Sequence, residues 1–284
     1  MILKTNNFDS ITTFKITLLV KLSFMKRKRY YYVIKIQFLG YRYHGWQKQS
    51  DTKTVHLMVD KTLRFVLKDL RFKSLGAGRT DAMVSAQEGA FELFIEEEPL
   101  TNLEVFLKDF NYNLPQDIRA LSIEEVDAKF NIIQDVKQKE YHYVFAQGDK
   151  FHPFCAPILT TILDPLDINL MKKGARLFEG KHHFQTYCYK ASEKGTYERE
   201  LTRCTLEENK LYQANFFPKE THLLRVIGKG FGRHQIRLMM GALIQLGKGE
   251  IDLDYISNSL KKESTQVMGF IAPASGLILN KVEF

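Results

Sequence analysis

Cysteine is scarce in this chain of 284 residues. The three that occur are Cys155, Cys188 and Cys204, an odd number with no C-x-x-C pair. This set argues against a disulfide scaffold and favours a reducing, cytoplasmic compartment. His182 and His183 lie near Cys188 in the sequence, but their spacing matches no zinc-binding pattern. We therefore interpret these residues as structural and expect no metal site.

The chain also lacks an apolar run of about 20 residues, the length needed to span a bilayer. Residues 16–24 are too few, contain Lys21 and have no small-residue cleavage site, which argues against a signal peptide. Met25 begins the sequence MKRKRYYYVIKIQF, which is typical of a natural start because a basic tip leads directly into a strand. We interpret residues 1–24 as a mis-annotated upstream extension or a disordered tail, and expect no membrane partner.

Acidic residues are fewer than basic ones. The 41 Lys+Arg against 33 Asp+Glu give a formal net charge of +8 and a pI of about 9.2. Such an excess attracts polyanions, including nucleic acids and anionic membrane surfaces, although a mildly basic protein without such a partner fits it equally well. Apolar residues at 44% and charged residues at 26% are typical of globular proteins.

The sequence itself shows neither an internal repeat nor a low-complexity linker. Patterns rich in β-branched and aromatic residues predict strands at 31–38, 72–75, 91–95, 141–145 and 222–227. Apolar residues at helical spacing predict helices at 55–66, 168–178 and from about Arg233 to Gly247. Because the alternation is irregular, we expect an α+β fold with antiparallel or mixed sheets.

The length of the chain suits two domains, or one domain built from two halves. We place the division between Ile118 and Tyr141. This gives an N-terminal α/β subdomain of residues 25–130 and a C-terminal α/β subdomain of residues 131–284.

The segment Gly76 to Ala82 reads GAGRTDA and combines two glycines with a cation, a hydroxyl and a carboxylate. Glycines let a backbone take a tight path, and an arginine near Asp81 favours its charged form. An ionised, oriented carboxylate can act as a nucleophile or as a base. Taken alone, however, a glycine-rich turn whose Thr80 and Asp81 bond to nearby backbone is the stronger interpretation.

A second segment, residues 228–237, reads GKGFGRHQIR. Its glycines alternate as G-x-G-x-G, which does not match a dinucleotide-binding fingerprint. We expect a helix N-terminus here, where Lys229, Arg233 and Arg237 form an anion site. That site could hold a phosphate or neutralise Asp81 across a cleft, and the alternative is a basic helix face in solvent.

A third segment, residues 41–49, reads YRYHGWQKQ and interleaves aromatic residues with cations. Such a series suits stacking on unpaired bases and contact with phosphates. The only tryptophan of the chain, Trp46, lies here beside Gln47. Taken alone, however, a tryptophan such as Trp46 is more often a core anchor than a base platform.

Read together and in order, these segments resemble the TruA-type tRNA pseudouridine synthases, from about Tyr31 to Phe284. The motif YDGxxYxGWQxQ of that family corresponds to FLGYRYHGWQKQ at 38–49, and GRTDAGVHA corresponds to GRTDAMVSA at 78–86. Five further matches follow in order: the Asn-Leu-Pro at 113–115 with Asp-Ile at 117–118, Lys139 with Tyr141 and Tyr143, the helix from Pro165 through Gly180 to Phe184, the phrase GFGRHQIRLMMG at 230–241, and APASGLIL at 272–279.

The resemblance implies a fold of two α/β subdomains with ferredoxin-like connectivity, whose sheets join into one larger sheet around a basic central cleft. It implies an isomerase that converts uridine to pseudouridine in tRNA, in the anticodon stem-loop, without a cofactor or a catalytic metal. It leaves monomer and homodimer open, because bacterial members are homodimers and the phrase at 230–241 is closest to the eukaryotic branch, which includes monomers.

The resemblance also implies roles for particular residues. Asp81 is the catalytic aspartate, and Arg79 helps to displace the target base from its stack. Tyr141 packs against the flipped uracil, Arg237 pairs with Asp81, and Leu277 forms part of the apolar wall around the base. Beyond this pocket, the expected RNA contacts are Trp46, Gln47, Lys229 and Arg233.

Some positions depart from the family pattern. Met83 replaces a glycine, Ser85 a histidine and Leu39 an aspartate, and Ile133 with Gln134 replace an Arg-Phe pair. Changes at the entrance affect RNA contacts more than chemistry. The alternatives are therefore a synthase acting on a different RNA, or an RNA-binding protein of the same fold with reduced or lost catalysis. The change at Met83 distorts the loop if that position needs a positive φ.

Overall fold

A computed structural model describes residues 28–284, so the proposed extension at 1–24 lies outside the described residues. Within that range the chain forms one mixed sheet of 10 strands in the order β4-β1-β3-β10-β5-β9-β8-β7, with β2 beside β3 and β6 beside β5. Five α-helices accompany the sheet in the described part. The predicted α+β class and the single joined sheet are confirmed.

The N-terminal half has the order β-α-β-β-α-β. Its elements are β1 (Arg29–Phe38), α2 (Val55–Leu67), β2 (Phe72–Gly76), β3 (Ser85–Glu96), α3 (Leu103–Asn113) and β4 (Ile118–Val126). The strands pair antiparallel, β1 with β3 and β4, and β2 with β3. The spatial order β4-β1-β3-β2 is therefore ferredoxin-like.

The C-terminal half repeats this connectivity. Its elements are β5 (Gln138–Gln147), β6 (Thr160–Ile162), α4 (Ile168–Arg176), β7 (Gly180–His183), β8 (Glu198–Glu208), β9 (His222–Gly228), α5 (Gln235–Gly247), α6 (Leu253–Ser259) and β10 (Leu277–Glu283). With β6, β7 and α6 as additions, the order β10-β5-β9-β8 in the sheet again follows the β-α-β-β-α-β pattern.

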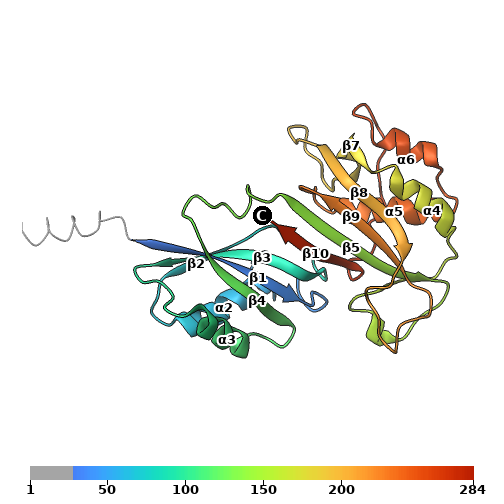
Figure 1. Ribbon diagram of the computed structural model, residues 1–284. Coiled ribbons are helices and arrows are strands. Elements are labelled where there is room, and N and C mark those ends of the chain that lie inside the picture. Colours follow the sequence, from blue (N-terminus) through green and yellow to red (C-terminus); the bar gives the residue numbers. More distant parts are fainter. Residues whose placement is uncertain (1–27) are drawn as a thin grey trace, which may run out of the picture.

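The C-terminal strand joins the two halves. β10 pairs antiparallel with β5 and parallel with β3, where Ile278 lies opposite Ser85 and Leu279 opposite Ala86. Figure 1 shows β10 in the middle of the sheet, with α2 and α3 packed on one half and α4, α5 and α6 on the other. The segment that precedes β3 is thereby held at the centre of the molecule. The predicted division near residue 130 falls between β4 and β5 and stays a prediction.

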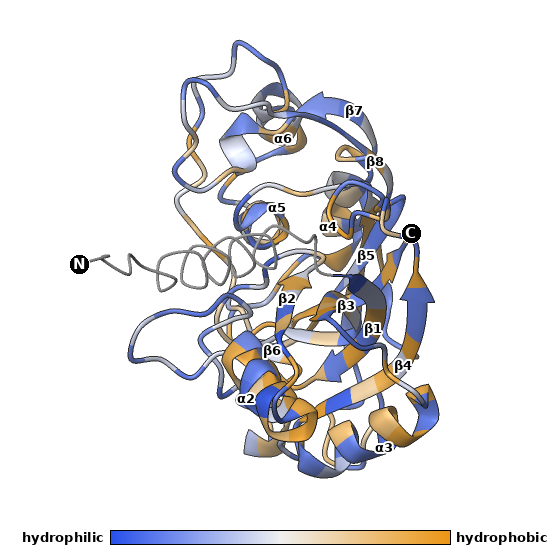
Figure 2. Ribbon diagram, turned by 90° about the vertical axis from the view of Figure 1, so that its left-hand side faces the viewer, coloured by the Kyte–Doolittle hydropathy of each residue, from blue (hydrophilic) through white to orange (hydrophobic). Residues whose placement is uncertain are grey.

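Each half has its own apolar core. The N-terminal core includes Phe91 and Phe110, and the C-terminal core includes Phe178 and Leu243, all fully buried. Figure 2 shows polar and apolar positions mixed along α2 and α3, as expected for helices that bury one face. Tyr141 packs against both cores and so lies where the halves meet.

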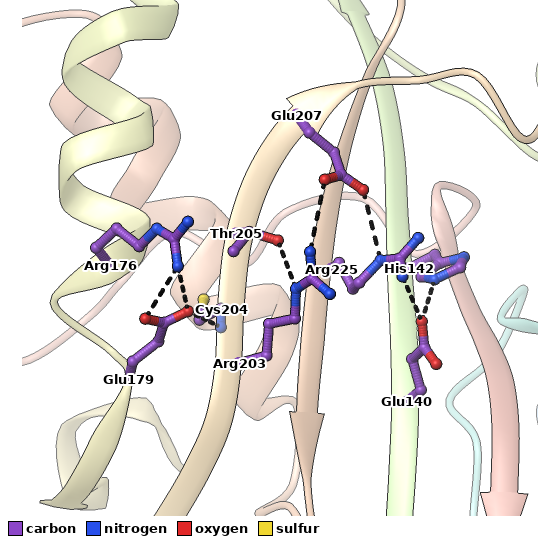
Figure 3. A network of polar contacts seen from close by, with 9 residues as sticks. All are labelled: Glu140, His142, Arg176, Glu179, Arg203, Cys204, Thr205, Glu207 and Arg225. Carbon is purple, nitrogen blue, oxygen red and sulfur yellow. Dashed lines mark hydrogen bonds and ion pairs between the residues drawn. The ribbon is translucent and has the colours of Figure 1, made fainter.

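One face of the strands β5, β9 and β8 carries a polar network (Figure 3). Arg225 on β9 lies 3.6 Å from Glu140 on β5 and 3.5 Å from Glu207 on β8. Glu140 also contacts His142 at 2.8 Å. Because side chains alternate along a strand, this network leaves Tyr141 on the other face.

Several local features differ from the sequence prediction, and the strands β6, β7, β8 and β10 and the helix α6 were not predicted. The helix α3 and the strand β4 were not predicted, although Phe106 and Phe110 are buried at helical spacing and Asn102 caps the helix at Val105 N. The helix α5 begins at Gln235, two residues later than expected. The cause is the left-handed backbone of His234, whose φ is 56°.

Candidate active site

Asp81 lies in the loop that connects β2 to β3, which we call the Asp81 loop (residues 77–84). A second segment, the Trp46 loop (residues 39–54), holds it in place. Trp46 N donates to Thr80 O at 3.2 Å, and Met83 N donates to Tyr43 O at 3.0 Å. The two sequence motifs at 38–49 and 78–86 are therefore one structural unit.

Glycine is required where these loops touch. A Cβ added to Gly45, whose φ is 85°, would lie 2.5 Å from Thr80 O. A Cβ added to Gly40 would lie 1.9 Å from Val84 O. Any larger residue at these two positions would push the Asp81 loop away.

Trp46 corrects one expectation from the sequence. Its side chain is 5% exposed and stacks on His56, with ring centroids 5.3 Å apart and an interplanar angle of 16°. It also covers Gly76, where an added Cβ would lie 2.3 Å from its Nε1 atom. Trp46 is a core residue beneath the Asp81 loop, and its ring is not open to stack on an RNA base. The neighbouring Gln47 is exposed.

Tyr43 and Arg42 of the same loop also have structural roles, because both side chains bond to Asp117. The buried Tyr43 hydroxyl donates to Asp117 Oδ1 at 2.6 Å, and Arg42 forms an ion pair with the same carboxylate. Burial, followed by the bond to Asp117, raises the pKa of Tyr43 to about 12. These side chains fasten the Trp46 loop to the start of β4.

The carboxylate of Asp81 meets two side chains from the other half. Arg237 Nη1 donates to Oδ2 at 3.2 Å, and His234 Nε2 lies 3.3 Å from Oδ1. Arg237 is itself held, because its Nε donates to Ala272 O at 2.8 Å and its backbone O accepts from Ala272 N at 3.1 Å. The structure thus brings together Asp81 and Arg237, as predicted. Asp81 remains 27% exposed and open to a substrate.

Tyr141 and Leu277 line the same junction. Tyr141 lies between Val226 of β9 and Leu279 of β10, and its ring meets Phe231 edge-on at 5.2 Å. Burial, and then the charge of Asp81, hold the pKa of Tyr141 well above its ordinary value. Leu277 is 6% exposed and shares a core cluster with Val84, next to the Asp81 loop.

The other predicted cations lie at the surface. Arg79, Lys229 and Arg233 are exposed. Among residues 28–284, Arg79 has no hydrogen-bond or ion-pair partner, so its guanidinium is available to a ligand. Arg233 lies over the ring of Tyr189, 5.1 Å from its centroid. These positions fit RNA contacts, and their roles stay predictions.

Three residues near the site received no role from the sequence. Lys139 on β5 donates to Ala77 O at 2.9 Å, and burial lowers the pKa of its ammonium group. His234 contacts Asp81, and Tyr189 stacks on His234. Lys139 and His234 lie inside recognised motifs, which was a usable signal. Tyr189 lies in none.

Two of the departures from the family pattern, Met83 and Ser85, lie in the Asp81 loop or at its end. Met83 has a φ of 67°, so this position does need a left-handed residue. Ser85 is buried and its Oγ accepts from Gly40 N at 2.9 Å. Leu39 and Ile133 are exposed at 37% and 57%. The loop therefore keeps its path with methionine at 83, and the exposed changes face solvent.

In the described range, no group of three or more His, Cys, Asp and Glu side chains is arranged to hold a metal ion. The three cysteines are free. No helix of residues 28–284 is long and apolar enough to cross a membrane.

Fold and geometry together place a partly exposed carboxylate, Asp81, beside Arg237 at the junction of two ferredoxin-like halves. Residues 175–284 match the family described as tRNA pseudouridine synthase. A tRNA pseudouridine synthase A 2 of Desulfotalea psychrophila is 31% identical over 265 residues, which cover 89% of this chain and 98% of that protein.

Other bacterial relatives are similar over the same length. The tRNA pseudouridine synthase A of Pseudothermotoga lettingae is 32% identical, with 88% of this chain and 97% of the relative covered. A tRNA pseudouridine synthase A 2 of Bacillus cereus is 30% identical, with 89% and 99% covered. The chain belongs to the TruA-type tRNA pseudouridine synthase family, and by class it is an isomerase.

Proposed function

We propose that this protein converts a uridine of the anticodon stem-loop of tRNA to pseudouridine, in the cytoplasm and without a cofactor. The pairing of Asp81 with Arg237 across the two halves carries the proposal, since it places a partly exposed carboxylate beside the partly buried Tyr141. The printed names of the relatives supply tRNA as the substrate class.

The reaction is an isomerisation and balances without a co-reactant. The N1–C1′ bond of uridine breaks, the detached uracil turns in the pocket, and its C5 forms a new bond to C1′. The proton on C5 leaves and N1 gains one, so composition and oxidation state are unchanged. Asp81 assists at the sugar, either by attack on C1′ or by promoting elimination.

The neighbours of Asp81 suit this task. The guanidinium of Arg237 lies 3.2 Å from Oδ2 of Asp81 and holds the carboxylate in place. Tyr141 is a neutral phenol at neutral pH and its raised pKa keeps it protonated into alkaline solution, so its ring can pack on uracil without adding charge. Leu277 and Phe231 supply apolar surface beside Tyr141.

The uridine must leave its stack before it can reach Asp81. Extruding a base costs a few kcal/mol. Arg79 stands two residues before Asp81, is exposed and lacks a partner in the described part of the chain, so it can occupy the space that the base leaves. Gln47, Lys229 and Arg233 are exposed around the loops and can contact the RNA backbone.

The test is a map of pseudouridine in RNA from cells that lack the gene. We expect one or more tRNA anticodon-arm sites to lose pseudouridine and to regain it with the wild-type gene but not with Asp81→Ala. Loss of pseudouridine only in another RNA would identify that RNA, and not tRNA, as the substrate. A map in which no pseudouridine site is lost would contradict the proposal. Sedimentation of the purified protein decides between monomer and homodimer.

A further inference from the structure

His234 lies in the active site without an assigned role. It is the residue before α5 and adopts a left-handed backbone, with a φ of 56°. Gly232 N donates to Oε1 of Gln235 at 2.7 Å, a bond that closes the turn before α5, and the imidazole of His234 makes no capping bond to the helix. The strained backbone of His234 therefore leaves its side chain free to serve another purpose.

That side chain reaches Asp81 from the same helical turn as Arg237. Arg237 bonds Oδ2 at 3.2 Å and His234 Nε2 lies 3.3 Å from Oδ1, so each carboxylate oxygen has its own partner. One contact, to Oδ2 alone, would let the carboxylate rotate about its Cβ–Cγ bond. Contacts to both oxygens fix the plane of the group.

The imidazole is itself held by an aromatic stack. Tyr189 lies parallel to it, with ring centroids 4.8 Å apart and an interplanar angle of 18°. The backbone of Tyr189 is tied to the same loop, because its N donates to Arg233 O at 2.9 Å. Tyr189 thus fixes the ring plane of His234, which in turn fixes where Nε2 points.

The charge state of His234 suits this contact. Burial lowers the pKa of His234, Asp81 raises it, and Arg237 and Arg233 lower it further, with a net downward shift. The ring is therefore neutral at neutral pH. Its Nδ1 has no hydrogen-bond partner among the described residues, so the tautomer that carries the proton on Nε2 is the one that suits the carboxylate. A neutral donor orients Asp81 without forming a second full ion pair that would weaken it as a nucleophile.

We propose that His234 is a positioning residue that sets the orientation of the Asp81 carboxylate, and that Tyr189 holds His234 in place. The kinetic test of this proposal rests on the proposed function, because it measures the conversion of uridine in tRNA. The expected effect is on the chemical step and not on RNA binding, because His234 acts through Asp81.

The kinetic test compares three variants in single-turnover assays with tRNA. His234→Phe keeps a ring on Tyr189 but removes Nε2, and we expect its rate to fall by about 100-fold with unchanged tRNA affinity, since a misplaced catalytic group costs about that much. His234→Gln restores a donor and should recover at least about 10-fold of that loss. Tyr189→Leu should fall between the wild type and His234→Phe.

The matched control is His222→Phe, at the start of β9, where the imidazole packs on Phe145. It should match the wild-type rate. A His234→Phe enzyme with the wild-type rate would overturn the proposal. So would a His234→Gln enzyme as slow as the phenylalanine variant, or parallel losses of rate and of tRNA affinity.

A second readout needs no activity. The pKa of His234, measured by NMR titration, should fall when Asp81→Asn removes the facing charge, and should be unaffected by the same change at Asp60. An unchanged pKa of His234 in the Asp81→Asn protein would contradict the contact between His234 and Asp81 and so overturn the proposal. If the wild-type protein forms no pseudouridine, the proposed function fails while this measurement still decides the role of His234.

Discussion

At the scale of single residues, Met83 carries a measurable backbone strain. Its φ of 67° lies in the left-handed region, which costs an L-residue about 1–2 kcal/mol. Met83→Gly removes that cost but adds about 0.4–1 kcal/mol of unfolded-state entropy. We expect a free energy of unfolding equal to the wild type or up to about 1 kcal/mol higher, measured by urea denaturation.

The comparison variant is Met83→Val, because a β-branched residue is disfavoured at positive φ. It should be the least stable of the three. If Met83→Gly unfolds more easily than the wild type, the side chain of Met83 and not its backbone matters to the loop.

Arg79 gives a prediction about base displacement. Arg79→Met keeps the length of the side chain but removes the charge, so the vacated space in the stack is filled less well. The reaction should slow by about 10- to 100-fold, in line with a few kcal/mol for base extrusion. A 2-aminopurine next to the target uridine should report less unstacking. Lys229→Met is the matched control. An equal loss of rate in that variant would mean that Arg79 acts only through general electrostatic attraction of the RNA and not through base displacement.

Residue identity predicted part of this site. Asp81 and Arg237 were paired from their motifs, and the structure places them in contact. For Trp46 the sequence left both a core anchor and an RNA contact open, because whether an aromatic ring is buried depends on what packs over it. The ring of Trp46 stacks on His56 and packs over Gly76, which lie 10 and 30 residues away in the chain. Tyr189 could not be found, since its role comes only from its position beside His234.

At the scale of elements, the Trp46 loop supports the Asp81 loop. Trp46→Ala should lower the free energy of unfolding by about 3–5 kcal/mol, the usual cost of removing a buried aromatic ring. It should slow catalysis more than it weakens tRNA binding. Chemical denaturation and filter binding measure the two effects.

Gln47→Ala is the neighbouring control and should change stability by no more than about 0.5 kcal/mol, because its side chain is exposed. A Trp46→Ala protein of unchanged stability but much weaker tRNA binding would restore the interpretation of Trp46 as a base platform.

Some elements with strong periodic patterns were predicted well, and others, including the long strand β8, were missed. The predicted strand at 31–38 and helix at 55–66 match β1 and α2 closely. The helix α3 was missed although Asn102 and the spacing of Phe106 and Phe110 carried its pattern. The short strands β6 and β7 have three and four residues, too few to show a period.

At the scale of the whole molecule, the sequence could not show how the halves join. The parallel pairing of β10 with β3 links residues almost 200 positions apart, and no local pattern encodes such a contact. The ferredoxin-like order of both halves came from the resemblance. Their shared topology has no counterpart as a sequence repeat.

Four histidines make the fold sensitive to acid. Burial lowers the pKa of four imidazoles, those of His56, His142, His222 and His234. A lowered folded-state pKa means that the unfolded chain binds protons first. Their contribution to stability is complete above about pH 6.5, the ordinary value, and is lost as pH falls through the folded-state values.

The free energy of unfolding should therefore decline as pH falls from about 7.5 to 5. Urea midpoints across this range measure it. A matched His56→Gln protein should show a shallower decline, since His56 is 6% exposed and contributes to the slope. Stability that rises with acidification would contradict this account of the buried imidazoles.

The central claim is that Asp81, held between the two halves, isomerises uridine in tRNA. The most direct measurement incubates purified protein with unmodified tRNA transcripts and quantifies pseudouridine by mass spectrometry, beside tRNA affinity. We predict that the wild type forms pseudouridine in the anticodon arm and that Asp81→Asn forms none while binding tRNA with similar affinity. Pseudouridine formed by Asp81→Asn, or none formed by the wild type in any tRNA, would contradict the claim.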